Sequence, residues 1–205
     1  MKKTKEENEI TRKKLLYSAL NVFVNLGYDK TRLEDIAQEA GFTRGAIYHN
    51  FGGKVQIFKA LIDEFGIRAS TIVKNVYSIN VTPCENIRVF IEQSLAYIED
   101  NEYYRKIQML TMFNNLQLHE ELKDICKNIA ADITVFQSYL SGLLKSGIDQ
   151  GEIKENINIQ AISISILGSI NGISMLWLIN QNEFSIKEYA KDIAEYFLSG
   201  IKIKQ

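Results

Sequence analysis

The side chains between residues 44 and 50 combine types that can bind duplex DNA. Arg44 can donate two parallel hydrogen bonds to one guanine, whereas tyrosine, histidine and asparagine side chains can donate to phosphate oxygens. Small residues beside the arginine would let a helix backbone approach the wall of a groove closely. The candidates in this run are Arg44, Gly45, Ala46, Tyr48, His49 and Asn50. Their order predicts a helix that enters the major groove.

Three flanking residues would add further groups that favour anions. Thr31 and Thr43 are each predicted to cap a helix N-terminus, and Thr31 would form a capping box with Glu34. The free amides and the dipole of a helix N-terminus both favour negative charge. Lys54 is predicted to open the following helix with a positive charge. Together these residues predict docking onto a phosphate backbone.

Helices must position these residues, because apolar side chains recur with a period of about 3.6 along this part of the chain. The predicted helices span residues 11–27, 31–40, 44–51 and 54–77. Gly27 would close the first helix as a residue just past its end. Gly41 lies in the turn between the two short helices, where a left-handed conformation would let them cross steeply.

The rest of the chain is also predicted to be helical, over 84–100, 103–115, 119–146, 159–181 and 186–200. No segment shows the alternation or the turn spacing of a sheet. We therefore expect an all-α fold of about nine helices. A three-helix helix-turn-helix head would occupy residues 1–56, and a larger helical domain for ligand binding and dimerisation would occupy residues 57–205.

The run from Thr11 to Leu61 resembles the DNA-binding domain of TetR-family transcriptional regulators. The matching residues are Thr31-Arg32-Leu33-Glu34-Asp35-Ile36-Ala37, then Ala40-Gly41-Phe42-Thr43-Arg44-Gly45-Ala46-Ile47-Tyr48-His49-Asn50-Phe51, then Lys54. The resemblance implies an all-helical dimer, in which the N-terminal heads read DNA and the larger C-terminal domains bind a small ligand.

The family's DNA contacts, carried over to this chain, fall into two groups. The phosphate contacts would be Thr31, Thr43, Tyr48, Asn50 and Lys54, and the residues facing base edges would be Arg44, Gly45 and Ala46. Arg32 and His49 complete the candidate set. The family usually has histidine where Asn50 stands and often has tryptophan or tyrosine where His49 stands. We expect this chain to dock on DNA in the same way as the family, with contacts of different strength where Asn50 and His49 stand.

The C-terminal half resembles the AcrR/TtgR-type multidrug-efflux repressors over Gly172-Ile173-Ser174-Met175-Leu176-Trp177-Leu178 and Phe184-Ser185-Ile186. Methionine and aromatic side chains at helical spacing would form an adaptable apolar pocket, in which a few amides orient the guest. The candidate ligand residues are Met109, Met112, Phe113, Asn114, Phe136, Tyr139 and Asn171. Core packing is the alternative for each of them, and an interhelical or intersubunit hydrogen bond would satisfy Asn171 equally well.

The segments 159–181 and 186–201 are predicted to form a homodimer interface, as a four-helix bundle across a two-fold axis. No charged side chain lies between Glu155 and Glu183, but glutamine, serine and asparagine interrupt the apolar residues there. Polar groups at this density are costly in hydrocarbon, so a helix buried by protein is favoured over a membrane span. A symmetric dimer would bind an inverted-repeat operator.

Composition and charge limit the other classes of function. The chain has 24 basic and 25 acidic residues, but residues 1–60 carry 11 basic against seven acidic ones. Two cysteines cannot form a disulfide framework, which fits a reduced, cytoplasmic setting. No nucleophile elbow or phosphate loop is present, so no enzyme and no cofactor is expected. His119 beside Glu120 and Glu121 fits a solvated helix start better than a metal site.

The sequence therefore predicts a ligand-responsive repressor that binds a palindromic operator of double-stranded DNA as a dimer. A small lipophilic or aromatic effector would release it, which would fit the control of efflux. The alternative is a DNA-bound architectural or cell-division factor that has the same head and no small-molecule inducer.

Overall fold

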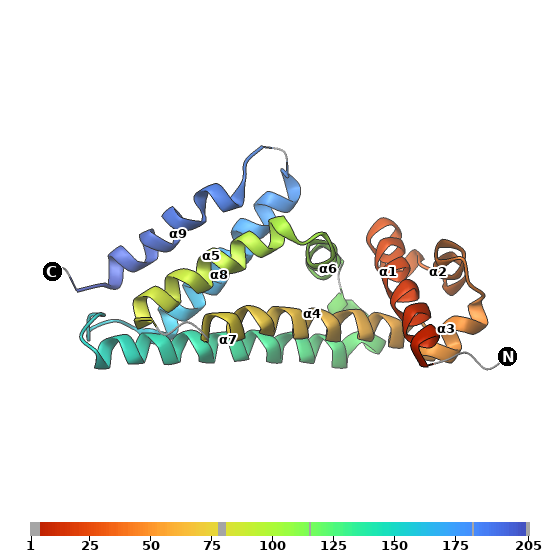
Figure 1. Cartoon of the computed structure of the whole chain (residues 1–205), viewed down its shortest axis with the longest axis horizontal. Coiled ribbons are helices and arrows are strands. Elements are labelled where there is room, and N and C mark those ends of the chain that lie inside the picture. Colours follow the sequence, from red (N-terminus) through yellow and green to blue (C-terminus); the bar gives the residue numbers. More distant parts are fainter. Residues whose placement is uncertain (1–4, 78–80, 115, 182, 204–205) are drawn as a thin grey trace. The chain divides into compact units, whose positions relative to one another are not determined.

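The computed structural model describes residues 5–77, 81–114, 116–181 and 183–203, without the side chains of Phe65 and residues 68–77. Within these ranges the chain forms nine α-helices, two short 3-10 helices and no β-strand (Figure 1). The helices are α1 (Lys5–Lys30), α2 (Leu33–Ala40), α3 (Arg44–Phe51), α4 (Lys54–Tyr77), α5 (Pro83–Asp100), α6 (Glu102–Phe113), α7 (Lys123–Asp149), α8 (Ile159–Ile179) and α9 (Ile186–Ile201). The predicted all-α fold class is confirmed.

The chain is divided into two compact units. Unit 1 comprises Met1–Gly66 and Lys106–Ile129, and unit 2 comprises Ile67–Arg105 and Ala130–Gln205. The chain passes from one unit to the other within α4, α6 and α7. Unit 1 thus contains the predicted head together with most of α6 and the beginning of α7.

Unit 1 is organised around an aromatic cluster at the end of α1. The rings of Phe23 and Phe58 meet edge to face with centroids 5.2 Å apart, and Tyr28 contacts both rings. Gly27 interrupts α1 with φ 78° and ψ 164°, a conformation that is essentially restricted to glycine. This break lets the chain turn so that Tyr28, only 2% exposed, packs onto α4.

Unit 2 has its core between α5, α8 and α9. The helix α5 packs along α9 and also contacts α8 (Figure 1). Its apolar stripe of Ile87, Ile91, Leu95 and Ile98 is completely buried. The spacing of three or four residues along one face is the pattern that makes a helix of this length amphipathic.

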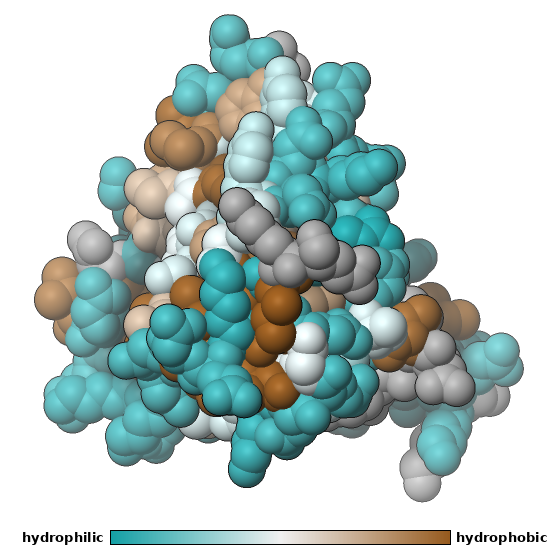
Figure 2. Space-filling view, turned by 90° about the vertical axis from the view of Figure 1, so that its left-hand side faces the viewer, coloured by the Kyte–Doolittle hydropathy of each residue, from teal (hydrophilic) through white to brown (hydrophobic). Residues whose placement is uncertain are grey.

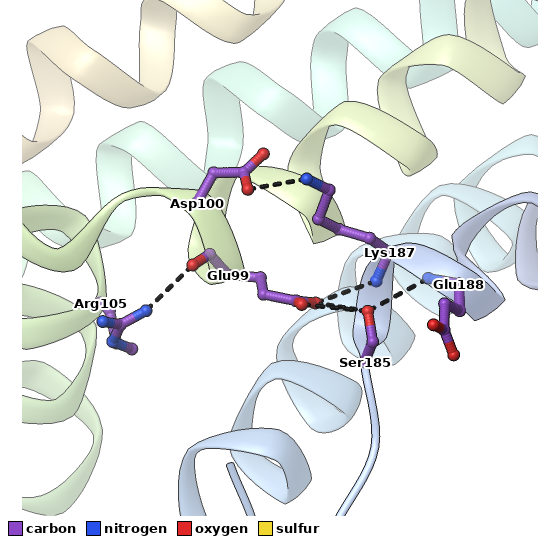
Figure 3. Close-up of polar contacts among 6 residues, drawn as sticks. All are labelled: Glu99, Asp100, Arg105, Ser185, Lys187 and Glu188. Carbon is purple, nitrogen blue, oxygen red and sulfur yellow. Dashed lines mark hydrogen bonds and ion pairs between the residues drawn. The ribbon is translucent and has the colours of Figure 1, made fainter. Parts of the chain in front are cut away.

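A polar cluster ties the end of α5 to the beginning of α9 (Figure 3). The carboxylate of Glu99 accepts hydrogen bonds from the Ser185 hydroxyl at 3.0 and 3.1 Å and from the Lys187 amide at 3.1 Å. The Asp100 carboxylate binds the Lys187 ammonium at 2.8 Å. The Glu99 carbonyl accepts from Arg105 at 3.0 Å, so the turn into α6 joins the same cluster.

Apolar side chains remain exposed on α8 and α9 in the single chain. Figure 2 shows brown apolar areas among hydrophilic ones on the side at the left of Figure 1. The large exposed apolar residues of these two helices are Ile164, Met175, Leu176, Ile179, Tyr189 and Tyr196. Among the described residues, α8 alone is long and apolar enough to cross a membrane, a test that core helices of soluble proteins also pass.

The predicted helices agree with most of the observed ones, with three differences. The helix predicted over 11–27 extends from Lys5 to Lys30, although Gly27 interrupts it. The predicted helix over 119–146 begins only at Lys123, because two 3-10 helices, Leu116–Leu118 and Glu120–Leu122, come first. These tight turns bury Leu116 and Leu122, which are 3% and 0% exposed. The capping role predicted for Thr31 is wrong, because α2 begins at Leu33 and Arg32 precedes it.

Candidate nucleic-acid interface

The two short helices α2 and α3 form a helix-turn-helix. Gly41 ends α2 in the left-handed conformation with φ 69°, and Phe42 donates its amide to the Ala37 carbonyl at 2.9 Å. The Thr43 hydroxyl accepts from the Ala46 amide at 3.3 Å, as predicted for the N-cap of α3. Ile47 is completely buried and anchors the inner side of α3.

The outer side of α3 exposes most of the predicted DNA contacts. Arg44, Gly45, Tyr48 and His49 are all exposed, and Ala46 is partly exposed. The Arg44 guanidinium binds Glu34 of α2 at 2.5 Å and the Tyr48 hydroxyl at 2.8 Å. The Tyr48 hydrogen bond and the Glu34 charge raise the pKa of Arg44, so the side chain carries a stable positive charge.

The end of α3 is held by a residue that the sequence analysis missed. Arg12 of α1 donates to the Asn50 carbonyl at 2.9 Å, and its guanidinium lies 4.2 Å from the Phe51 ring centroid. The Asn50 amide nitrogen donates to the Ala46 carbonyl at 2.7 Å. Arg12 thus fixes the C-terminal end of the candidate reading helix onto α1, where cations also suit the helix dipole.

The first candidate contacts, Thr31 and Arg32, have different surroundings. Thr31 is only 2% exposed, and its hydroxyl donates to the Gly27 carbonyl at 2.7 Å. Arg32 is exposed, and its amide donates to the Asp35 carboxylate at 2.8 Å. The threonine therefore stabilises the turn after α1, and the arginine is the one of the two whose side chain is accessible to a ligand.

Lys54 opens α4, as predicted, but its ammonium has close partners. The nitrogen lies 4.3 Å from the Tyr28 ring centroid and donates to the Asp29 carbonyl at 3.3 Å. Partial burial lowers the pKa of Lys54, and the Asp29 and Glu121 carboxylates oppose this shift. The side chain is thus directed by the turn at the end of α1.

The Tyr28 side chain also connects this turn to the segment between α6 and α7. Its hydroxyl donates to Glu121 at 3.2 Å, and its amide donates to the Asn114 side chain at 3.3 Å. Burial, followed by the Glu121 charge and hydrogen bond, raises the pKa of the Tyr28 phenol. His119 lies against the same ring, with centroids 5.2 Å apart, and its Nδ1 is 3.4 Å from an Asp29 oxygen.

The candidate ligand residues are divided between the two units. Met109, Met112, Phe113 and Asn114 belong to unit 1, and Phe136, Tyr139 and Asn171 belong to unit 2. Met109 and Met112 are partly buried, whereas Phe113 is 46% exposed. The pocket that both groups are predicted to line stays a prediction.

Within unit 2, the aromatic candidates pack around Phe90 of α5. Its ring centroid lies 6.2 Å from that of Phe136 and 5.5 Å from that of Tyr139. Asn171, the candidate amide on α8, is exposed in the single chain. Its side chain donates to the Leu167 carbonyl at 3.1 Å, one helical turn earlier.

Three residues of this region have roles that the sequence does not indicate. Arg12 looks like a solvated charge on an amphipathic helix, Glu34 is predicted only as part of a capping box with Thr31, and Tyr28 looks like an ordinary core aromatic. Their partners Asn50, Arg44 and Glu121 are ten or more residues away along the chain. Among the described residues, no group of three or more His, Cys, Asp and Glu side chains could hold a metal ion.

Both parts of the chain match known families. Residues 15–61 match the bacterial regulatory proteins of the tetR family, and residues 82–203 match the C-terminal region of MAATS-type transcriptional repressors. The second match covers well over half of the chain.

Individual relatives align with this chain over nearly the full length of both proteins. The fatty acid metabolism regulator protein of Bacillus subtilis is 24% identical and aligns over 93% of this chain and 95% of its own. The structure of NalD, the secondary repressor of the MexAB-OprM multidrug efflux pump in Pseudomonas aeruginosa, superposes with a TM-score of 0.83 at 22% identity. The alignment covers 98% of this chain and 100% of NalD. The structure of FadR from Bacillus subtilis in complex with stearoyl-CoA has a TM-score of 0.75 at 22% identity, over 92% of this chain and 98% of the FadR chain.

The helix-turn-helix of unit 1 and the C-terminal helices thus belong to one known architecture, and the chain is a member of the TetR family of bacterial transcriptional regulators.

Proposed function

We propose that this TetR-family repressor binds an inverted-repeat operator as a homodimer and leaves it when a lipophilic small ligand binds the C-terminal part of the chain. The observation that carries the proposal is the outer side of α3. Arg44, Tyr48 and His49 are exposed there, on a helix that the buried Ile47 and the Thr43 cap hold in place. In this role Arg44 contacts base edges, whereas Tyr48 and Lys54 contact phosphates.

A homodimer through α8 and α9 is supported by a stripe of exposed residues along α8. The stripe recurs every three or four residues and comprises Ala161, Ile164, Gly168, Asn171, Gly172, Met175 and Ile179. Small residues within an apolar stripe allow two helices to pack closely. Because Asn171 lies in this stripe, we propose for it a hydrogen bond across the dimer in place of a ligand contact.

A lipophilic effector is supported by residue types and by the relatives. One relative is named a fatty acid metabolism regulator, and one related structure holds stearoyl-CoA. Another represses a multidrug efflux pump. In this chain, Met109 and Met112 on α6 and Phe136 and Tyr139 on α7 supply adaptable apolar surface.

Release requires that ligand binding changes the position of the heads. A ligand shifts the equilibrium only by its difference in affinity between two states, typically ~1–3 kcal/mol. Within unit 1, the segment from α6 to α7 binds the end of α1 through Asn114 and Glu121 on Tyr28. We propose that movement of this segment reaches Lys54 through the Tyr28 ring.

Binding to DNA can be tested by selecting duplexes from a random pool and measuring affinity over a range of salt concentrations. If each head neutralises about four phosphates, log affinity falls with log salt with a slope of roughly −7. Arg44→Ala is expected to erase sequence preference, whereas Lys54→Ala is expected to weaken binding to all sequences alike. Affinity that does not depend on salt would contradict the proposal.

The effector is tested separately by thermal unfolding with lipophilic cations, aromatic drugs and long-chain acyl-CoA. A ligand at 100 times its Kd stabilises the folded state by about 2.7 kcal/mol, which is a readily measured shift in Tm. The same compound must then release the protein from the selected duplex. If none of the three classes has either effect, an architectural DNA-binding factor without an inducer is favoured.

A further inference from the structure

The Arg44 guanidinium joins the two helices of the helix-turn-helix. Its Nη1 lies 2.5 Å from the Glu34 carboxylate on α2, and its Nη2 donates to the Tyr48 hydroxyl on α3 at 2.8 Å. The guanidinium carbon also lies 5.3 Å from the Tyr48 ring centroid. Glu34, ten positions before Arg44, and Tyr48, four positions after it, thus hold an otherwise flexible side chain at two points.

The fold has little need for this ion pair. The side chains of Arg44 and Glu34 are 54% and 56% exposed, and pairs so accessible to water contribute little to stability. The buried Ile36 and Ile47 and the left-handed Gly41 already fix how α2 and α3 cross. The pair therefore acts mainly on the direction of the Arg44 side chain.

The remaining hydrogen-bonding groups of this pair suit a contact with DNA. A guanidinium has five N–H groups, and Glu34 and Tyr48 use one each, which leaves three for a base edge. The Tyr48 oxygen accepts from Arg44, so its own O–H can still donate to a phosphate. An arginine that is already directed loses less conformational freedom when it binds a guanine.

We propose that Glu34 is a positioning residue for sequence recognition, which holds the Arg44 guanidinium, together with Tyr48, toward one base pair of each operator half-site. This inference rests on the proposed function, in which Arg44 contacts a base. The Glu34 carboxylate also places a negative charge close to Arg44. It therefore weakens binding to every duplex but increases the difference in affinity between the selected duplex and the others.

Two substitutions at Glu34 distinguish its effect on the position of the Arg44 side chain from the effect of its negative charge. Glu34→Ala removes both the anchor and the charge, whereas Glu34→Asp keeps the charge but is one methylene too short to reach Arg44 in its present place. Glu39→Ala, an exposed carboxylate on the same helix, is the matched control. The probes are the selected duplex, the same duplex with the Arg44-dependent base pair exchanged, and a random duplex.

Discrimination is the ratio of the Kd values for the exchanged and the selected duplex. A bidentate arginine–guanine contact gives a wild-type ratio of about five- to 150-fold, and we expect both Glu34 variants to lower it by about fivefold. Glu34→Ala should also bind the random duplex about two- to threefold more tightly, because a like charge is removed. Glu39→Ala should keep the wild-type ratio, and thermal unfolding should show that all three variants fold.

The inference is overturned if either Glu34 variant keeps the wild-type ratio, since the carboxylate would then act by charge alone or not at all. Failure of the proposed function looks different. In that case the wild type selects no duplex, or Arg44→Ala keeps the preference, whatever happens at Glu34.

Discussion

At Gly45 of α3, we expect an added methyl group to affect the proposed DNA binding without disturbing the fold. A Cβ at this position would meet only the Thr43 hydroxyl oxygen, at 3.7 Å, which is ordinary van der Waals contact. Gly45 lies next to Arg44 on the exposed side of α3, where the backbone is proposed to approach the wall of a groove. A side chain there should therefore be tolerated by the free protein and rejected by DNA.

We expect Gly45→Ala to raise the free energy of unfolding by up to about 1 kcal/mol, because glycine is a poor helix former. Its affinity for the selected duplex should fall by about tenfold, equivalent to ~1.4 kcal/mol of lost contact. Urea unfolding and fluorescence anisotropy measure the two quantities. Gly142→Ala is the matched control, since this exposed glycine of α7 has nothing within 4 Å of its Cβ position. It should gain similar stability and bind DNA like the wild type.

An unchanged affinity in Gly45→Ala would show that the backbone of α3 stays away from the groove wall. A loss of stability would instead show that the first turn of α3 does not tolerate a side chain, which the open space around the glycine contradicts.

Thr43 and Thr31 show which local interactions could be predicted from the sequence. Thr43 was correctly predicted as a cap because its partner is three residues away, and such spacing is visible in the sequence. Thr31 has the same residue type, yet its hydroxyl binds the Gly27 carbonyl and α2 begins two residues later. The difference arises from the backbone turn at Gly27, which local spacing does not encode.

At the scale of elements, the Glu99 cluster determines how α9 begins (Figure 3). The Ser185 hydroxyl accepts from the Glu188 amide at 3.4 Å and donates to Glu99, while Glu99 also accepts from the Lys187 amide. The negative charge lies at the positive end of the α9 dipole. A residue of α5 thus caps a helix that lies more than eighty residues further along the chain.

We expect Glu99→Ala to lower the free energy of unfolding by about 1–2 kcal/mol, because an amide and a hydroxyl lose a charged acceptor. Asp100→Asn is the control, since its ion pair with Lys187 joins side chains that are 57% and 47% exposed. Such a surface pair should contribute less than about 0.5 kcal/mol. Urea unfolding at one protein concentration compares the two variants, and equal losses would show that Glu99 does not cap α9.

The elements themselves were largely predictable, because most of them follow from apolar spacing and local capping. The bounds of α3, α5, α8 and α9 agree with the predicted helices to within two residues. The two 3-10 helices before α7 were not predicted, since tight turns that bury Leu116 and Leu122 leave no regular apolar spacing in the sequence. The Glu99 and Tyr28 clusters could not be predicted from local spacing because their partners lie roughly ninety residues away.

For the whole molecule, the exposed stripe of α8 is the surface through which two copies of the chain are proposed to pack. Ile164 and Val135 are both 59% exposed in the single chain, but Ile164 lies in the stripe and Val135 lies on α7. If two copies of the chain pack through α8 and α9, only Ile164 becomes buried in the dimer. A lysine at that position would then bring an unpaired charge into an apolar interface.

We expect Ile164→Lys to be monomeric at micromolar concentrations in sedimentation velocity, and Val135→Lys to remain dimeric. A monomer contacts one half-site, so the affinity of Ile164→Lys for the full operator should fall by more than about tenfold, because the second head no longer binds at high effective concentration. Its dependence on salt should also weaken to about half the wild-type slope, since half as many phosphates are neutralised. A dimeric Ile164→Lys variant with wild-type affinity would show that the heads are paired through another surface, and the stripe on α8 would need a different partner.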